Sequence, residues 1–264
     1  MPAVDVPLQG ARFGQTARRD WWWVQPLLTF LGLLIFLVYS FWAAAQGDNY
    51  RSGPYLSPFY SPLVFGPHSW LGAWPTWWPA PILSASWIVL WAPAGFRVTC
   101  YYYRGAYYKA FWADPPSCAV GEPRKSYWGE RSFPLILQNV HRYFMYLAVL
   151  VLIVLGYDTY QAFWFTDPAT GAVHAGFGVG TLVLLVNLVL LTCYTFGCHS
   201  LRHLVGGYLD RLARRPVRQG AYKCVSCLNR RHMLFAWMSL FMVMFADIYV
   251  RLCAAGIWTD WRIF

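Results

Sequence analysis

Long, nearly uncharged runs of apolar residues dominate the pattern of this chain. An α-helix needs roughly 20 such residues to cross a bilayer. Five segments meet that requirement: 27–45, 81–103, 137–157, 176–199 and 233–253. The second is the weakest, because Pro93 and Arg97 interrupt it. The pattern predicts an all-α integral membrane protein: a single membrane-anchor domain over residues 1–264, built as a bundle of five transmembrane helices.

Composition agrees with this interpretation. Only 12% of the residues are charged and 58% are hydrophobic, whereas a soluble domain carries about 25% charge. The excess of 21 Lys+Arg over 11 Asp+Glu therefore does not indicate a nucleic-acid partner. Basic residues instead collect in the cytoplasmic loops of membrane proteins.

The basic residues also predict an orientation. Three precede the first segment, five lie in 104–131 and eight in 202–231, whereas 46–80 holds one and 158–173 none. The positive-inside rule then places the N-terminus and both basic stretches in the cytoplasm and the C-terminus outside. We expect a multi-pass protein of the cell inner membrane.

Histidines and cysteines gather at the predicted cytoplasmic ends of the segments. His141 opens the third segment, Cys198, His199 and His203 close the fourth, and His232 opens the fifth. Polar groups at membrane depth usually mark function, and imidazoles four residues apart share one helix face. A metal or cluster site is one interpretation; capping of helix ends and contact with lipid headgroups is the other.

Two further patterns leave alternatives open. Cys224 and Cys227 form a C-x2-C that, with His199 and His203, allows a tetrahedral zinc site or a two-Cys, two-His iron–sulfur centre. A zinc-stabilised membrane scaffold is thus one rival function.

The charged pair inside the fifth segment bears on a second rival. Asp247 and Arg251 are four apart, which predicts an intrahelical ion pair. A transporter or channel would need a polar path through the midplane of the membrane, for which the segments offer little besides this pair and Asn187.

A quinone pocket is mostly apolar, with a few hydrogen-bond donors. Side chains suited to that role lie at the predicted inner level, although residues of these types more often serve as anchors at the membrane surface. The candidates are Trp21, Trp22, Gln25, Arg97, Tyr101 and Tyr102.

Four strings resemble the membrane anchor of actinobacterial succinate dehydrogenases. They are RVTCYYYRGAYYKAFWADPPSCAV (97–120), FPLILQNVHRYF (133–144), GCHSLRHLVGG (197–207) and LNRRHM (228–233). The resemblance implies a non-flavin subunit of an enzyme complex, succinate:quinone oxidoreductase. It would dock an iron–sulfur subunit and a flavoprotein on its basic cytoplasmic loops, pass electrons to menaquinone or ubiquinone, and allow a higher oligomer of the complex.

The resemblance also implies a cofactor. The mycobacterial type of this anchor is haem-free and carries a membrane-embedded Rieske-type [2Fe–2S] cluster with two Cys and two His ligands. The implied ligands are Cys118 and Cys198 on one iron and two of His141, His203 and His232 on the other, with His199 in reserve. The alternative within the family is a haem b anchor, with His141 and either His203 or His232 as axial ligands.

Overall fold

The computed structural model describes residues 12–66, 69–73, 84–124, 132–133, 135–208 and 211–264. The contacts between its residues divide the chain into two compact units. The first comprises Met1–Val38 and Arg97–His141, and the second Tyr39–Phe96 and Arg142–Phe264. That residues 1–264 form a single domain stays a prediction.

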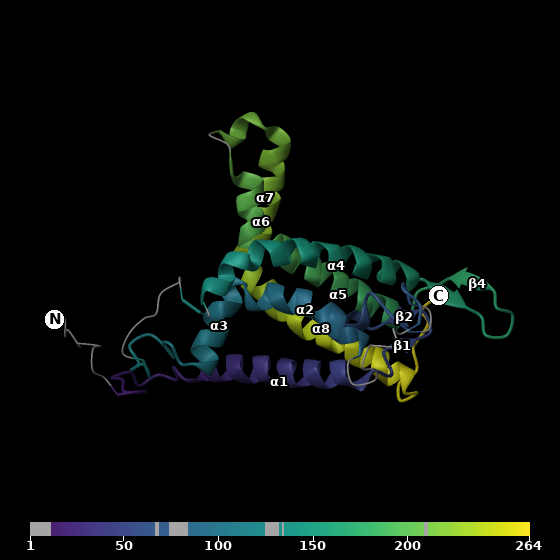
Figure 1. The fold of residues 1–264 in the computed structure, drawn as a ribbon, viewed down its shortest axis with the longest axis horizontal. Coiled ribbons are helices and arrows are strands. Elements are labelled where there is room, and N and C mark those ends of the chain that lie inside the picture. Colours follow the sequence, from purple (N-terminus) through teal and green to yellow (C-terminus); the bar gives the residue numbers. More distant parts are fainter. Residues whose placement is uncertain (1–11, 67–68, 74–83, 125–131, 134, 209–210) are drawn as a thin grey trace. The chain divides into compact units, whose positions relative to one another are not determined.

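Helices make up most of the described chain, as predicted (Figure 1). The α-helices are α1 (Val24–Gln46), α2 (Ala85–Val98), α3 (Tyr101–Phe111), α4 (His141–Gln161), α5 (Val179–Phe196), α6 (His199–Gly206), α7 (Pro216–Arg230) and α8 (His232–Ala254). Three 3-10 turns are η1 (Pro58–Tyr60), η2 (Leu135–Val140) and η3 (Leu212–Arg214). Strands β1 (Arg51–Ser52) and β2 (Tyr55–Leu56) pair antiparallel, as do β3 (Trp164–Thr166) and β4 (Val173–Ala175).

Four helical segments are long and apolar enough to cross a membrane within the described residues. They are Val24–Gln46, Leu135–Gln161, Val179–Phe196 and His232–Ala254. They correspond to the predicted segments 27–45, 137–157, 176–199 and 233–253. The interpretation as a helical membrane protein is therefore confirmed, with four candidate spans.

The second predicted span differs from the structure. Residues 81–83 lie outside the described part, and the rest of 81–103 is divided into the 14-residue α2 and the start of α3. Cys100 separates these helices because its backbone is extended, with φ −66° and ψ 132°. At 1.5 Å per residue α2 is about 21 Å long, less than the roughly 30 Å hydrocarbon core. A fifth crossing and the orientation of the termini stay predictions.

The fourth span ends earlier than predicted, at Phe196. A tight turn at Gly197 and Cys198 follows, and His199 opens α6. A Cβ on Gly197 would lie 2.8 Å from the carbonyl oxygen of Cys193, so only glycine fits this turn without rearrangement. His199 therefore belongs to a separate helix and not to the membrane span.

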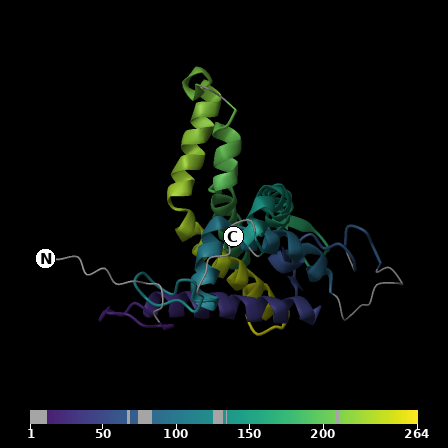
Figure 2. The same ribbon diagram turned by 60° about the vertical axis from the view of Figure 1, so that its left-hand side comes forward.

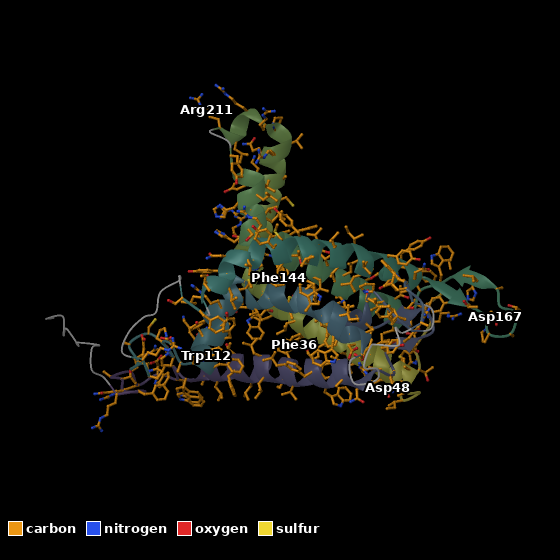
Figure 3. The ribbon with its side chains drawn as sticks, in the orientation of Figure 1. Phe36, Asp48, Trp112, Phe144, Asp167 and Arg211 are labelled. Atoms are coloured by element: carbon orange, nitrogen blue, oxygen red, sulfur yellow. The ribbon has the colours of Figure 1, made fainter. Side chains whose placement is uncertain are left out.

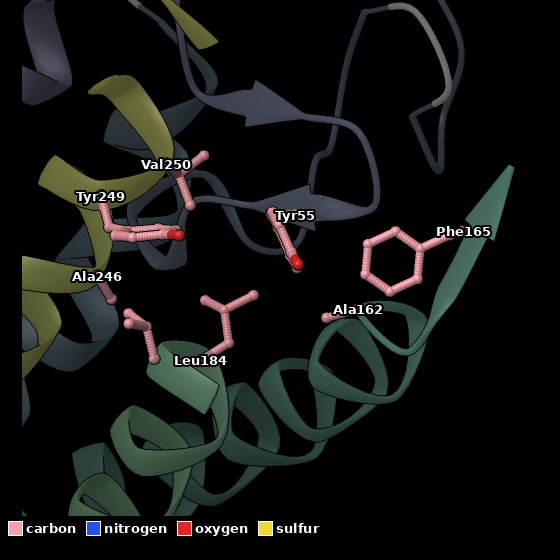
Figure 4. Packing of buried hydrophobic residues seen from close by; sticks show 8 residues of the cluster. Tyr55, Ala162, Phe165, Leu184, Ala246, Tyr249 and Val250 are labelled. Atoms are coloured by element: carbon pink, nitrogen blue, oxygen red, sulfur yellow. The ribbon is translucent and has the colours of Figure 1, made fainter. Parts of the chain in front are cut away.

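In the second unit an apolar cluster is buried where α5 and α8 pack together with the β1–β2 hairpin and the end of α4 (Figure 4). Its buried members are Tyr55, Ala162, Phe165, Val183, Leu184, Ala246, Tyr249 and Val250. Burial of aromatic and branched side chains between helices and hairpin fixes the register of α5 against α8.

A closed polar network lies beside this cluster. Asp247 and Arg251 form the predicted pair, with Arg251 Nε 2.7 Å from Asp247 Oδ2. The hydroxyls of Tyr39 and Ser57 also donate to Asp247. The remaining guanidinium nitrogens of Arg251 donate to the carbonyl oxygens of Ala43, at 2.8 Å, and Asp48, at 3.0 Å. Because both charges are satisfied within the fold, they do not line an open polar path.

Asp260 fastens the C-terminal segment to the start of α5. Its carboxylate accepts hydrogen bonds from the hydroxyls of Tyr55 and Tyr249, both at 2.7 Å, and from the N–H of Gly180 at 2.8 Å. The following residues bond to the backbone of Phe177, whose N–H donates to the carbonyl of Phe264 at 2.9 Å. A carboxylate at a helix N-terminus is also favoured by the helix dipole.

Replacing Asp260 by Asn is expected to lower the free energy of unfolding of this end of the molecule by about 1.5–3 kcal/mol, the usual contribution of hydrogen bonds to a charged acceptor. The measurement is thermal unfolding of the purified complex. Asp48→Asn is the matched control, because the Asp48 side chain is exposed. Equal melting temperatures for both variants would contradict the role given to Asp260.

Candidate functional site

In the first unit the loop that carries Cys118 is held against the N-terminal segment. The N–H of Gly14 donates to Gly121 O at 3.0 Å, and the N–H of Gly121 donates to Gln15 O at 2.8 Å. A Cβ on Gly121 would lie 2.2 Å from the carbonyl oxygen of Arg12, so this close approach requires glycine. Arg18 donates to the carbonyl oxygen of Cys118 at 2.9 Å. The exposed thiol of Cys118 thus lies on a backbone positioned by a guanidinium.

His141 is held by a neighbour that the sequence interpretation missed. Its Nδ1 lies 2.9 Å from the hydroxyl oxygen of Thr99, and both side chains are buried. A hydrogen bond of this kind fixes the orientation of an imidazole, as it does for metal-ligating histidines. The only sequence signal for Thr99 is its place next to Cys100 in the string RVTC.

The quinone candidates all belong to the first unit, where cations and aromatic rings are interleaved. Arg97 donates to the hydroxyl of Tyr103 at 2.6 Å, and its guanidinium lies 5.5 Å from the centre of that ring. Arg104 lies 4.5 Å from the centre of the Tyr101 ring. Tyr103 and Arg104 were not among the predicted site residues, although Tyr101 and Arg104 are three apart and so share a helix face.

The other candidates differ in their exposure. Trp21 is 78% exposed and stacks on Trp23 at 6.3 Å. Gln25 is also exposed. Tyr102 packs against Tyr103 at 5.7 Å between ring centres. Trp22 is half-buried. These side chains offer an apolar, aromatic surface to a ligand, and Arg97 offers the positive charge.

In the second unit Cys198 and the α6 histidines cluster at the turn after α5. Cys198 is buried and is the N-terminal capping residue of α6, where its Sγ accepts from the N–H of Ser200 at 3.3 Å. His199 Nε2 and His203 Nε2 are 2.9 Å apart. The pKa of His199 is lowered by partial burial, then by the neighbouring His203 and Arg202. A lowered pKa favours the neutral imidazole, which is the form that binds metals.

His232 lies beside the same turn. A Cβ placed on Gly197 would be 3.3 Å from His232 Nδ1. The imidazole stacks on Tyr194, with ring centres 4.9 Å apart. In the second unit Cys198, His199, His203 and His232 therefore all follow the same end of α5, at the turn, on α6 and at the start of α8.

The structure does not assemble a complete metal site from the described residues. Within them, no three His, Cys, Asp or Glu side chains converge to hold a metal ion. Cys118 and His141 belong to the first unit and the other four predicted ligands to the second. Cys224 and Cys227 are exposed on α7, and they do not join His199 and His203 as zinc ligands. What the second unit offers is a converging imidazole pair beside a buried thiol.

The fold and these side chains define the chain as a multi-helix membrane protein with cysteine, imidazole and aromatic groups at the ends of its spans. A family model described as "Actinobacterial succinate dehydrogenase subunit SdhC" matches residues 24–256. The chain belongs to this family, and it is therefore a membrane subunit of a succinate dehydrogenase complex that assembles with other subunits.

A solved structure agrees with this assignment. A chain of the "Mycobacterium smegmatis Sdh1 complex in the apo form" is 43% identical, with a TM-score of 0.85, and the similarity covers 100% of both chains. A comparison with curated proteins gives no match.

Proposed function

We propose that this chain is the quinone-reducing anchor of its complex, with five spans, a cytoplasmic N-terminus and an outer C-terminus. It docks an iron–sulfur subunit and a flavoprotein subunit on the cytoplasmic side and relays their electrons to menaquinone or ubiquinone. Family membership carries this proposal. Support for docking comes from the basic stretch 104–131, where Lys109 is exposed.

The quinone site of this proposal uses the first unit. Arg97 and Tyr101 are the polar contacts to the quinone carbonyls, and Trp21, Trp22 and Tyr102 form the apolar surroundings, with Gln25 as a further donor. The hydrogen bond from Arg97 to Tyr103 supports this choice, because it holds the guanidinium in one orientation among aromatic rings. Phe30 packs on Phe111 at 5.0 Å and so joins the start of α1 to α3.

Arg97→Gln is expected to lower kcat/KM for quinone reduction by roughly tenfold or more, since a hydrogen bond from a charged donor is lost. Succinate oxidation with a soluble dye as acceptor is expected to stay unchanged. Arg51→Gln removes an exposed cation from β1, outside the proposed quinone site and docking stretch, and is the control. The measurement is paired quinone and dye kinetics on the purified complex; an unaltered kcat/KM for quinone in the Arg97 variant excludes this site.

The proposal also includes a Rieske-type [2Fe–2S] cluster. Its donors are Cys118, Cys198 and two of His141, His199, His203 and His232. The donor types fit, and the 2.9 Å separation of the two Nε2 atoms supports pairing His199 with His203 on one iron. When bound, such a cluster supplies one-electron transfer at a potential raised by its imidazole ligands. Cys198 is buried at the start of α6, where its Sγ accepts a hydrogen bond from the N–H of Ser200.

A haem b anchor is the second candidate, and one observation favours it. His141 is buried, and its Nδ1 is hydrogen-bonded to Thr99, the arrangement that orients an imidazole as an axial ligand. Iron, acid-labile sulfide and haem quantification of the native complex separates the two candidates. The haem candidate is favoured over the cluster if the sulfide content equals that of the partner subunits alone and a reduced b-type absorption band is present.

A further inference from the structure

The second basic stretch folds into a compact hairpin of α6 and α7 with its own internal contacts. Arg218 of α7 donates to three carbonyl oxygens at the end of α6: Val205 at 2.8 Å, Gly207 at 2.7 Å and Leu204 at 3.3 Å. This arrangement caps the C-terminus of α6 with a cation.

Arg202 of α6 completes the contact between the two helices. It donates to Ser226 at 3.1 Å and lies 5.3 Å from the centre of the Tyr222 ring. Gly206 lets that ring approach, because a Cβ there would lie 2.7 Å from it. Two of the eight basic residues of the stretch therefore hold the hairpin together.

The other basic residues face outward. They are Arg211, Arg214, Arg215, Lys223, Arg230 and Arg231. Across residues 198–208 and 211–232, the part of this stretch that the structure describes, there is no acidic side chain. Among the described residues none of the six outward cations has an ion pair. The hairpin therefore presents a strongly positive surface, with Arg211 at its tip (Figure 3).

An exposed apolar stripe runs along α7 next to this charge. Val217 is 87% exposed, and Ala221 and Cys224 follow it on the same face at a spacing of three to four residues, both exposed. Lys223 and Arg230 are seven residues apart and lie on another side of the helix. α7 thus has one face against α6, one apolar exposed face and one basic exposed face.

The hairpin joins two membrane spans. It begins just after α5 and ends where α8 starts, so its base is at the membrane surface. Figures 1 and 2 show that it runs across the direction of α4, α5 and α8 and does not continue them. A helix with that placement, an apolar stripe and flanking cations has the properties of an interfacial helix on an anionic membrane.

We propose that the α6–α7 hairpin lies on the membrane and binds anionic lipid headgroups, with the Val217–Cys224 stripe immersed in the lipid boundary and Lys223 and Arg230 on the phosphates. Each such cation near an anionic surface strengthens association roughly fivefold. The hairpin therefore anchors the loop between α5 and α8 against the bilayer. This inference does not rest on the electron-transfer proposal.

Two native cysteines of α7 provide the test. Cys224 belongs to the apolar stripe, whereas Cys227, three residues on, does not, and both thiols are exposed. The complete complex is placed in nanodiscs of zwitterionic phosphatidylcholine, with or without anionic phosphatidylglycerol. A water-soluble maleimide labels the thiols, and peptide mass spectrometry gives the rate for each one. We expect Cys224 to react several-fold more slowly in the anionic nanodiscs and Cys227 to change much less.

The variant Lys223→Gln/Arg230→Gln is expected to abolish that lipid dependence, whereas Arg51→Gln, which removes an exposed cation from β1, preserves it. Equal labelling of wild-type Cys224 in both nanodiscs overturns the proposal. The proposal is also overturned if Cys224 is protected from labelling to the same extent in both nanodiscs and in lipid-free detergent. In that case a soluble subunit with an acidic surface covers the stripe.

Discussion

A complex carrying His203→Ala is expected to keep succinate–dye activity and to lose quinone reduction by roughly tenfold or more. His203 is one member of the imidazole pair at 2.9 Å, and losing a ligand costs at least as much as losing an outer-shell partner, which typically costs 10–100-fold. The cluster signal in electron paramagnetic resonance is expected to disappear together with the activity, because electron transfer to quinone depends on it.

Companion variants show which imidazole acts with His203. Of the variants His199→Ala and His232→Ala, we expect one to lose quinone reduction as the His203 variant does. We expect the other to keep nearly wild-type quinone reduction. His174→Ala removes an exposed imidazole from β4 and is the control. If the His203 variant retains both its iron and sulfide content and its quinone activity, His203 is not a ligand.

Breaking the Asp247–Arg251 pair is expected to destabilise the chain more than any exposed charge substitution. Asp247 is fully buried and Arg251 nearly so. Removal of one partner leaves an uncompensated buried charge, which costs about 3–5 kcal/mol. Asp247→Ala also leaves Tyr39 and Ser57 without their acceptor. We expect a large fall in the amount of assembled complex and in its melting temperature.

The double variant Asp247→Leu/Arg251→Met tests the cause of that loss. Replacing both charges by apolar side chains of similar size is often neutral, so we expect it to recover most of the assembly lost in Asp247→Ala. Glu122→Ala, an exposed acidic residue, is the control. Blue-native electrophoresis of membranes measures the assembled fraction. A double variant as unstable as the single one would show that the network's hydrogen bonds, and not the unpaired charge, dominate.

Periodicity and charge were sufficient for the long spans because those signals are local. α1, α4, α5 and α8 are predominantly apolar, and their bounds differ from the predicted ones by a few residues. The i, i+4 spacing of Asp247 and Arg251 likewise requires only a helix. The second segment was harder, because the extended backbone at Cys100 and the length of α2 are not visible in hydropathy.

The candidate site likewise has features that the sequence predicted and features that it did not. The sequence indicated residue types suited to metal and quinone chemistry, and it showed that His199 and His203 share a helix face. It did not indicate that Thr99 holds His141 or that Arg18 holds the backbone of Cys118. Those partners are 42 and 100 residues apart in the chain, and a single sequence has no local signal for contacts at such separations.

The sequence by itself determined that this is a helical membrane protein with basic stretches between spans and with cysteines and histidines at the ends of its helices. Those properties depend on residue type and spacing of less than about 20 residues. Only the tertiary structure decided that the chain turns at Gly197, that α6 and α7 run across the direction of the spans, and that Asp247 and Asp260 each collect donors from several segments. Such features depend on close packing between distant parts of the chain, which local patterns do not specify.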